Sequence, residues 1–500
     1  MCRKSTASFF CLAVFLATAM LAGCNGSKVS ADETAALQQL APAPQSFIHT
    51  VKKGESIPAV LRSYISNTSF MTVAELEAAF REANQKPRGV NLEPGEPVVI
   101  PGYLFEPIVE TPVPLAKDAE IRAIYFTGTM TGSAKGIHTI RRWHELGGNS
   151  VVFDIKDSDG SLSIHFDHPL APKHKNVPIS NLPKFVRFLH SMQMHAIARI
   201  ALFRDENIAR NHSELAVQSK RNRQPWRENG KLVWIDPSRR EVQDYNLALA
   251  KAVAASGVDE VQFDYVRFPA EGDQKDADFA FLKQEPKITR ADVISNFLER
   301  AYGELHPMGV LLSLDVFGVM AWQHSVDLAH TGQDIVALAR HCDVLSPMIY
   351  PSHFFGMDGY ARPGDAPEHF IGTSMERFEK ITAGSGVVLR PWLQAFRWRT
   401  PTYSPKYIQT QVKVAKEKGG IGFLFWNAGN DYSKPFLAMP LMRADGNRYF
   451  RDKNLLAAVP RRTSANQTPL AGTEGRTSDP APAQPAKADA HPSDVGPPTH

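Results

Sequence analysis

The 500-residue sequence predicts an α/β fold built around a (β/α)8 barrel, with a small βααβ module before it and a disordered tail after it. Between residues 120 and 445, eight short runs rich in β-branched and aromatic residues alternate with runs of helical periodicity. Eight such units in about 300 residues match the size of a closed barrel. An open doubly wound sheet is the alternative, but the turn at residues 128–133 lacks the glycine spacing of a dinucleotide site.

The elements of the barrel follow from this alternation. The expected strands are residues 122–128, 150–157, 195–203, 260–268, 310–318, 343–350, 387–396 and 420–427. The expected helices include residues 137–146, 182–192, 242–255, 291–305, 332–340, 374–382 and 407–417. Residues 458–500 are rich in Ala, Pro, Ser, Thr and Asp and nearly free of aromatic residues, so we expect them to be disordered.

The first 23 residues have the pattern of a signal peptide. Arg3 and Lys4 precede an apolar run at residues 9–21, which is too short to span a membrane comfortably. The run ends in Leu-Ala-Gly-Cys24, which resembles a bacterial lipobox and implies a lipoprotein whose Cys24 carries the lipid. An ordinary secretory signal with a chance cysteine is the alternative. We therefore expect a lipid anchor in the bacterial cell envelope, in the outer or the cytoplasmic membrane.

The segment after the signal peptide divides into a tether, a module and a linker. Residues 24–46 are polar and indicate a tether, and residues 103–119 are rich in proline and indicate an extended linker. Residues 47–102 show the order strand, helix, helix, strand, and Thr72 with Glu75 forms a capping-box pattern. This module resembles LysM at Val51, Gly54, Ser56, Asn84, Pro94, Gly95, Ile100 and Pro101. The resemblance implies binding to N-acetylglucosamine chains of peptidoglycan or chitin. Because Pro58 departs from the pattern, a module that only packs on the barrel is the alternative.

Charge and cysteine usage exclude several classes of function. The formal net charge is only +4 and the charges are interleaved in sign, so we expect no nucleic-acid partner. No Cys/His cluster has zinc spacing and no phosphate-binding loop is present, so we expect no metal and no cofactor. Cys342 is expected to be a small buried hydrophobic residue beside a strand.

Side chains alternate between the two faces of a strand. If the polar residue at the end of each expected strand points into the barrel, every second residue before it also points inward. The inward set is then Asp154, Lys156, Arg199, Gln262, Asp264, Ser313, Asp315, Met348, Tyr350, Arg390, Trp392, Gln394 and Trp426. A purely structural barrel would fill these layers with Val, Ile and Leu. Buried charges are costly unless they are paired, so this set predicts a mouth that binds a polar ligand.

Asp264 is the main catalytic candidate, because it lies near the end of the longest strand motif, residues 259–269. Hydrolysis of a glycosidic bond needs one carboxylic acid and a second carboxylate that acts as nucleophile or base. Asp315 lies at the matching position of the next strand, so we expect Asp264 to be the nucleophile or base and Asp315 the acid. Asp154 is a rival for either role. A buried Asp264 paired for structure alone with an arginine such as Arg267 is the alternative.

The remaining candidates would bind the substrate. Trp392 and Trp426 are candidate stacking platforms for the apolar face of a sugar ring. Cations near Asp264 could keep it ionised, and amide and hydroxyl groups could hold sugar hydroxyls. The expected substrate-binding residues are Lys156, Arg199, Gln262, Arg267, Tyr350, Trp392, Gln394 and Trp426.

Residues 121–440 resemble a bacterial family of glycosyl hydrolase domains of the TIM-barrel clan. The shared motifs are residues 153–160, 198–200, 234–237, 245–246, 259–269, 346–353 and 425–427. The resemblance implies a barrel and a carbohydrate-active site, but no settled catalytic pair. Met348, Tyr350 and Trp426 are also similar to chitinase-like barrels, although Val266 stands where their second acidic residue is expected.

Together these observations predict a glycoside hydrolase that acts on a polysaccharide, held by a lipid anchor and a glycan-binding module at the bacterial cell wall. The alternative is a non-catalytic lipoprotein that binds peptidoglycan or another polysaccharide through a remnant barrel. A transglycosylase or a deacetylase acting on the same glycan is a weaker option, because no metal triad for a deacetylase is visible.

Overall fold

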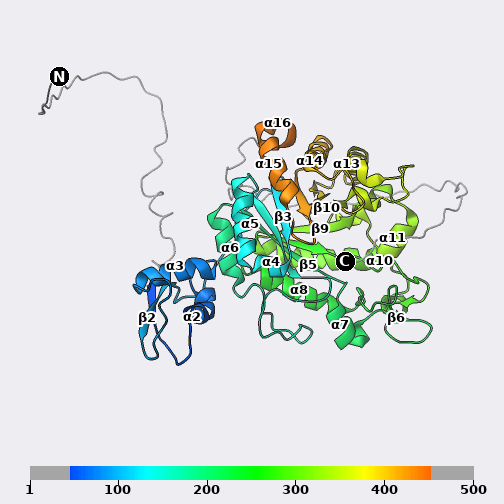
Figure 1. Cartoon of the computed structure of the whole chain (residues 1–500). Coiled ribbons are helices and arrows are strands. Elements are labelled where there is room, and N and C mark those ends of the chain that lie inside the picture. The colour runs from blue at the N-terminus through cyan, green and yellow to red at the C-terminus, as the bar shows by residue number, and fades with distance from the viewer. Residues whose placement is uncertain (1–44, 452–500) are drawn as a thin grey trace, which may run out of the picture.

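The computed structural model describes residues 45–451, which form a small N-terminal module beside a large barrel (Figure 1). The predicted signal peptide, the lipidation site at Cys24, most of the tether and the predicted tail at residues 458–500 lie outside the described residues. Within the described part of the chain, no helix has the length and apolar character needed to cross a membrane.

The N-terminal module has the predicted order strand, helix, helix, strand. Strand β1 (Gln45–Thr50) pairs antiparallel with β2 (Pro97–Tyr103), and helices α2 (Ile57–Tyr64) and α3 (Val73–Ala83) lie between them in the chain. Thr72 and Glu75 form the expected capping box at the start of α3. The side chain of Asn84 ties the end of α3 to β2, because it donates to the carbonyl of Val99 and accepts from its N–H, at 2.8 and 2.7 Å. These contacts fix the helices on the strand pair.

The module packs against two helices of the barrel, α5 (Ala134–Glu145) and α6 (Leu182–Ser191), as Figure 1 shows. Arg141 of α5 forms an ion pair with Glu75 of the module. Lys184 of α6 donates through Nζ to the carbonyl of Ile65, and burial lowers the pKa of Lys184 to about 8. These polar contacts hold the module directly on the wall of the barrel.

Eight parallel strands form the closed barrel, and one of them is divided into two short segments. The strands are β3 (Ile121–Phe126), β4 (Ser150–Lys156), β5 (His195–Ala201), β7 (Glu260–Asp264), β9 (Leu311–Phe317), β10 (Val344–Ile349), β11 (Val388–Leu389) with β12 (Trp392–Gln394), and β13 (Gly422–Trp426). The ring closes because β13 pairs with β3 and β10 pairs with both β9 and β12. The (β/α)8 prediction is confirmed. The strand expected at residues 387–396 is divided at Pro391, which has no N–H to donate to the ladder.

Helices cover the outside of the strands or lie in the loops that connect them. Besides α5 and α6 they are α4 (Gly128–Thr131), α7 (Glu206–Asn211), α8 (Arg240–Ala254), α9 (Phe281–Gln284), α10 (Arg290–Leu305), α11 (Ser325–Thr331), α12 (Ile335–Leu338), α13 (Pro367–Ile381), α14 (Pro405–Glu417), α15 (Ser433–Ala444) and α16 (Gly446–Tyr449). The helix expected at residues 332–340 is reduced to α12, because Gly332 ends α11 with a φ of 69°. A two-residue strand pair, β6 (Gln218–Ser219) with β8 (Ala277–Asp278), braces the long loops after β5 and β7.

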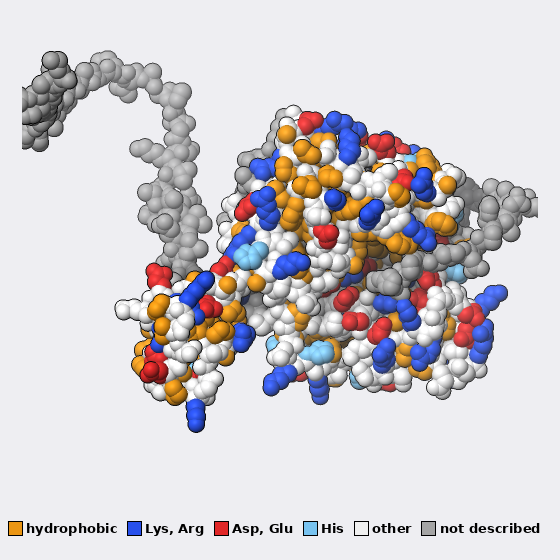
Figure 2. Space-filling view, viewed as in Figure 1, with side chains coloured by type: hydrophobic (Ala, Val, Ile, Leu, Met, Phe, Trp, Pro, Cys, Tyr) orange, Lys and Arg blue, Asp and Glu red, His pale blue; other side chains and the backbone are white. Residues whose placement is uncertain are grey.

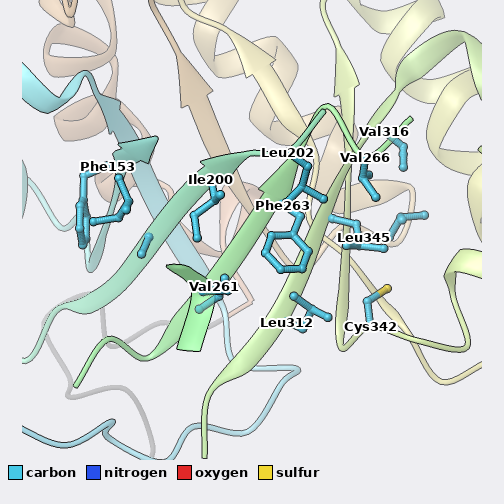
Figure 3. Packing of buried hydrophobic residues seen from close by; sticks show 14 of the residues in the cluster. Phe153, Ile200, Leu202, Val261, Phe263, Val266, Leu312, Val316, Cys342 and Leu345 are labelled. Atoms are coloured by element: carbon cyan, nitrogen blue, oxygen red, sulfur yellow. The ribbon is translucent and has the colours of Figure 1, made fainter. Parts of the chain in front are cut away.

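The main hydrophobic core lies between the strands and the helices. Phe153, Ile200, Val261, Phe263 and Leu312 project from neighbouring strands into this layer (Figure 3). Cys342 lies in the same cluster and is buried, as expected. On the surface that Figure 2 shows, positive and negative side chains are interspersed, which fits the low net charge.

The segment between the module and the barrel closes the amino-terminal end of the barrel. Leu115 is buried and packs with Ile121 and other interior residues. The N–H of Val113 donates to Asp259 at 2.7 Å. His190 of α6 lies between the carboxylates of Glu110 and Asp259, at 3.0 and 3.1 Å, and these partners raise its pKa against the effect of burial. The predicted extended linker is therefore anchored along part of its length.

Candidate active site

Arg199 of β5 gathers the three aspartates of the barrel interior. Its Nη1 donates to Oδ1 of Asp154 at 2.5 Å, and its Nη2 donates to Oδ2 of Asp264 at 2.6 Å. The Nε atom lies 3.2 Å from Oδ2 of Asp264 and 3.9 Å from Oδ2 of Asp315. One cation thus serves three carboxyl groups, which cannot all be ionised without a large electrostatic cost.

The strand register explains why these side chains meet. Asp154 pairs with Arg199 across β4 and β5, and Phe263 pairs with Leu314 across β7 and β9. Asp264 and Asp315 are the next residues, so they lie at the same level on adjacent strands. Both are near the carboxyl ends of their strands, where active sites of such barrels are built. The predicted convergence of Asp154, Asp264 and Asp315 is present.

Asp315 has the environment of a protonated acid. Its side chain is 1% exposed, compared with 10% for Asp264. Burial and then the neighbouring charge of Asp264 raise the pKa of Asp315 well above its ordinary value, although Arg199 acts in the opposite direction. The indole N–H of Trp392 donates to Oδ1 of Asp315 at 2.7 Å and fixes its orientation. This environment favours the protonated form of Asp315.

Asp264 is the carboxylate that solvent reaches. Its Oδ1 accepts from the backbone N–H of Tyr265 at 2.6 Å, and its Oδ2 accepts from Arg199. Hydrogen bonds from a guanidinium and a backbone N–H fix the orientation of the carboxyl group. Tyr265 has a φ of 51°, in the left-handed region, directly after the strand ends. Backbone strain of this kind is concentrated at functional sites and here aims the amide at Asp264.

Asp154 is held from two sides. Burial raises the pKa of Asp154 to about 7, while Arg199 acts in the opposite direction. The hydroxyl of Tyr125, on β3, donates to Oδ2 of Asp154. Tyr125 also stacks on Trp426, with ring centroids 4.0 Å apart. Sequence reasoning assigned no inward residue to the first strand, although alternation along β3 would have placed Tyr125 inside.

Two predicted aromatic residues reach the mouth of the barrel. Trp426 is partly exposed, and its ring lies 5.3 Å from the guanidinium carbon of Arg199. Tyr350 contacts His353 and Phe396 edge to face, with centroids 5.5 and 5.6 Å away. Burial and the charges of Asp315 and Asp264 raise its pKa. Trp426 therefore lies on the side of Tyr125 and Asp154, whereas Tyr350 lies near Asp315 and Asp264.

Lys156 was expected to line the interior, and this prediction is wrong. The register of β4 shifts between Asp154 and Lys156, and such a bulge redirects the side chain that follows. Lys156 Nζ contacts Oδ2 of Asp205 at 3.0 Å and Oδ1 of Asn246 at 2.9 Å, and Asn246 belongs to the outer helix α8. Lys156 is therefore a structural cation in the layer between strands and helices.

Trp392 and Gln394 do not present free groups to a ligand. Trp392 is 1% exposed and its N–H is used by Asp315, so it is a core residue and not a stacking platform. The amide nitrogen of Gln394 donates to Thr400 Oγ1 at 2.8 Å, and its oxygen accepts from the N–H of Ser352 at 3.2 Å. Gln394 therefore fixes the loops after β10 and β12.

Arg267 and Gln262 form their hydrogen bonds with groups other than Asp264, although the charges of Arg267 and Asp264 interact. The guanidinium of Arg267 is packed against Trp234 and Phe317, at 4.8 and 4.3 Å, and donates to the carbonyl of Phe268. Arg199, and not Arg267, is the ion-pair partner of Asp264. Gln262 is fully buried one layer below Asp264, with Ser346 as its hydrogen-bond partner at 3.5 Å.

A second buried ion pair lies deeper in the barrel. Glu260 faces Arg390 at 2.8 Å and His195 at 3.0 Å, and all three side chains are buried. Arg390 and the other partners lower the pKa of Glu260 to about 2, against the effect of burial. Sequence reasoning placed Arg390 inside but overlooked Glu260, which shares a strand face with Gln262 and Asp264. This pair neutralises the interior below the candidate site.

Within residues 45–451, no group of three or more His, Cys, Asp or Glu side chains is arranged to hold a metal ion. The site presents carboxyl groups, the Arg199 guanidinium and tyrosine hydroxyls.

The barrel matches the model of a described protein family. The family model described as "Putative glycosyl hydrolase domain" matches residues 123–432. No curated protein sequence matches the chain. A hypothetical protein from Ruminiclostridium thermocellum ATCC 27405 is similar at 31% identity, covering 39% of this chain and 97% of its own, with a TM-score of 0.34.

Two further solved structures are similar at lower sequence identity. The PgaB (BpsB) glycoside hydrolase domain from Bordetella bronchiseptica is 13% identical, over 69% of this chain and 100% of its own, with a TM-score of 0.46. The spore cortex-lytic enzyme SleL from Bacillus megaterium QM B1551 is 14% identical, over 81% and 86%, with a TM-score of 0.39.

Proposed function

The chain belongs to the glycosyl hydrolase domain family whose model matches residues 123–432, and we propose that it hydrolyses a polysaccharide by two-carboxylate chemistry. The observation that carries this proposal is the pairing of unlike carboxyl groups. Asp264 is reached by solvent and accepts hydrogen bonds from Arg199 and from a backbone N–H. Asp315 beside it is buried and has a raised pKa. An accessible carboxyl group beside a buried one with a raised pKa gives the unlike environments that a base and an acid need in one site.

In this mechanism Asp315 donates its proton to the glycosidic oxygen as the bond to the anomeric carbon breaks. Asp264 either attacks the anomeric carbon or takes a proton from the attacking water. Because their Oδ2 atoms lie 3.2 and 3.9 Å from the same Arg199 Nε, they are at most about 7 Å apart, which admits both the retaining and the inverting geometry. Asp154 and Tyr125 contact Arg199 and fix its position.

Two neutral variants test these roles. Asp264→Asn is expected to abolish turnover, by about 1,000-fold or more, because the nucleophile or base is lost, while the single amide oxygen can still accept from Arg199. Asp315→Asn is expected to slow hydrolysis of natural linkages strongly but to spare aryl glycosides with acidic leaving groups, which need little protonation. The measurements are initial rates on a glycan panel and circular dichroism to verify folding. Undiminished turnover by Asp264→Asn would rule out its role.

We also propose that the protein acts at the bacterial cell wall. The lipobox-like sequence supports an anchor at Cys24, and the βααβ module supports binding to peptidoglycan or another N-acetylglucosamine-containing glycan. A second binding site on the same chain would raise the local concentration of glycan at the barrel. Cys24→Ala is expected to release the protein from the membrane fraction and to abolish palmitate labelling. Retention of both would contradict the anchor.

A second candidate function is glycan binding without catalysis. The observation in its favour is the burial of Asp154 and Asp315, whose side chains are each 1% exposed and lie against Arg199 as a structural network would. This alternative predicts binding to wall glycan with no turnover on any substrate, and binding that is unchanged in Asp264→Asn. Turnover by the wild-type protein that Asp264→Asn removes would exclude it.

A further inference from the structure

We propose that His353, Phe355, Trp398 and Arg399, here called the aromatic shelf, form a subsite for a glycan sugar next to the catalytic carboxylates, and that Arg399 selects sugars bearing a carboxylate. The inference rests on the proposed function, because it concerns the same glycan. The shelf is built by the loops that follow β10 and β12, so it lies at the carboxyl end of the barrel.

A continuous series of rings joins the shelf to the catalytic centre. Burial raises the pKa of Tyr350, which lies close enough to Asp315 and Asp264 for their charges to raise it further. Its ring contacts His353 with a centroid distance of 5.5 Å. His353 contacts Trp398 at 4.9 Å. Local desolvation and the nearby Arg399 lower the pKa of His353 to about 4, although the residue as a whole is exposed. A glycan that occupies the centre can therefore extend along rings without a break.

The outer end of the series is open to solvent. Phe355 is 59% exposed, Trp398 is partly exposed, and Arg399 is exposed. The Arg399 guanidinium carbon lies 4.9 Å from the Phe355 ring and 4.5 Å from the Trp398 ring. Exposed rings of this size bind the apolar faces of pyranose sugars, whose hydroxyls remain in water.

Arg399 is held in place but has no acidic partner. Its φ of 48° is in the left-handed region, and two rings flank its side chain. Among residues 45–451 it forms no ion pair, and the two acidic residues in the loop after β10 are already engaged, Asp358 with His369 and Asp365 with Thr402 and Arg362. A positioned guanidinium without a counter-charge, beside a sugar platform, fits the carboxylate of an acidic sugar.

Peptide-free peptidoglycan glycan strands and chitin oligosaccharides of equal length form a matched pair of probes. Both have β-1,4-linked N-acetylated amino sugars, but only the former carries a lactyl carboxylate on alternate sugars. Binding is measured by isothermal titration calorimetry on the full chain with Asp264→Asn, so that the glycan is not consumed. The unsubstituted shelf is expected to bind the charged strands about tenfold more tightly than chitin oligosaccharides.

Three further substitutions in that protein separate the contributions. Arg399→Gln is expected to remove the preference, with about tenfold weaker binding of charged strands and unchanged binding of chitin oligosaccharides. Trp398→Ala is expected to weaken both by about fivefold. Arg397→Gln, an exposed arginine outside the ring stack, is the control for general charge and should change neither.

Equal affinity for the two probes, or a preference that survives Arg399→Gln, would overturn the inference. Neither result bears on hydrolysis, which the rates of the wild-type protein and Asp264→Asn decide separately. Conversely, an absence of turnover would leave the binding comparison intact.

Discussion

Replacement of Arg199 by methionine tests whether this one cation compensates the negative charge of the aspartates around it. Methionine keeps much of the side-chain volume, but it removes the donations to Asp154 Oδ1 and Asp264 Oδ2. Removing one partner of a buried ion pair costs about 3–5 kcal/mol, because the other charge stays buried without compensation. We expect a loss of this size in the free energy of unfolding at pH 8.

The cost of Arg199→Met should depend on pH. Burial already raises the pKa of Asp154 from 3.8 to about 7, so its contribution to stability is greatest below pH 4 and is lost as the pH rises through 7. By the same linkage, this single group changes the stability of the wild-type protein by up to about 4 kcal/mol between those limits. Without Arg199 the carboxyl groups bind protons more readily, and protonated carboxyl groups need no cation. The loss of unfolding free energy caused by the substitution should therefore be smaller at pH 5 than at pH 8.

The assay is urea unfolding followed by tryptophan fluorescence and circular dichroism at pH 5 and pH 8. The double variant Arg199→Met with Asp154→Asn is the matched control, because it removes one of the carboxylates that lose their partner. It should recover part of the stability at pH 8 and little at pH 5. An equal loss at both pH values, or no loss at all, would refute the shared-cation account of the site.

Two other substitutions probe structural roles. Lys156→Met should cost about 3–5 kcal/mol of unfolding free energy, since it leaves Asp205 buried and unpaired, yet glycan binding measured by calorimetry should not change. Weaker glycan binding would instead indicate that Lys156 contributes to the binding site. Leu115→Ala should cost about 2–3 kcal/mol in thermal or urea unfolding, because it empties part of the barrel floor. An unchanged midpoint would mean that the segment before β3 is not docked there.

The barrel could be predicted because its signals are local. Strand composition, helical periodicity and the order of the elements are all written in short stretches of chain, and alternation along β7 placed Asp264 inside. The same alternation failed at Lys156, because the bulge in β4 depends on how that strand pairs with β5. Sequence pattern reports which residues are polar but not which strand will shift its register.

The roles of the polar interior residues were harder to predict for a similar reason. Trp392 and Gln394 have the expected inward positions, but their polar groups are used by Asp315 and by the neighbouring loops. Whether a buried donor is free depends on partners far away in the sequence. Glu260 was missed because it lies at the start of its strand, where an interior charge is supported only by the distant Arg390.

The docking of residues 109–119 determines where this protein can be divided. A fragment that begins at the first barrel strand would leave the interior open to water where Leu115 sits and would take away the amide that Asp259 binds. Recombinant versions intended to isolate the barrel should therefore start ahead of Val109. Loss of solubility in shorter versions would then reflect an uncovered base and not a failure of the barrel itself.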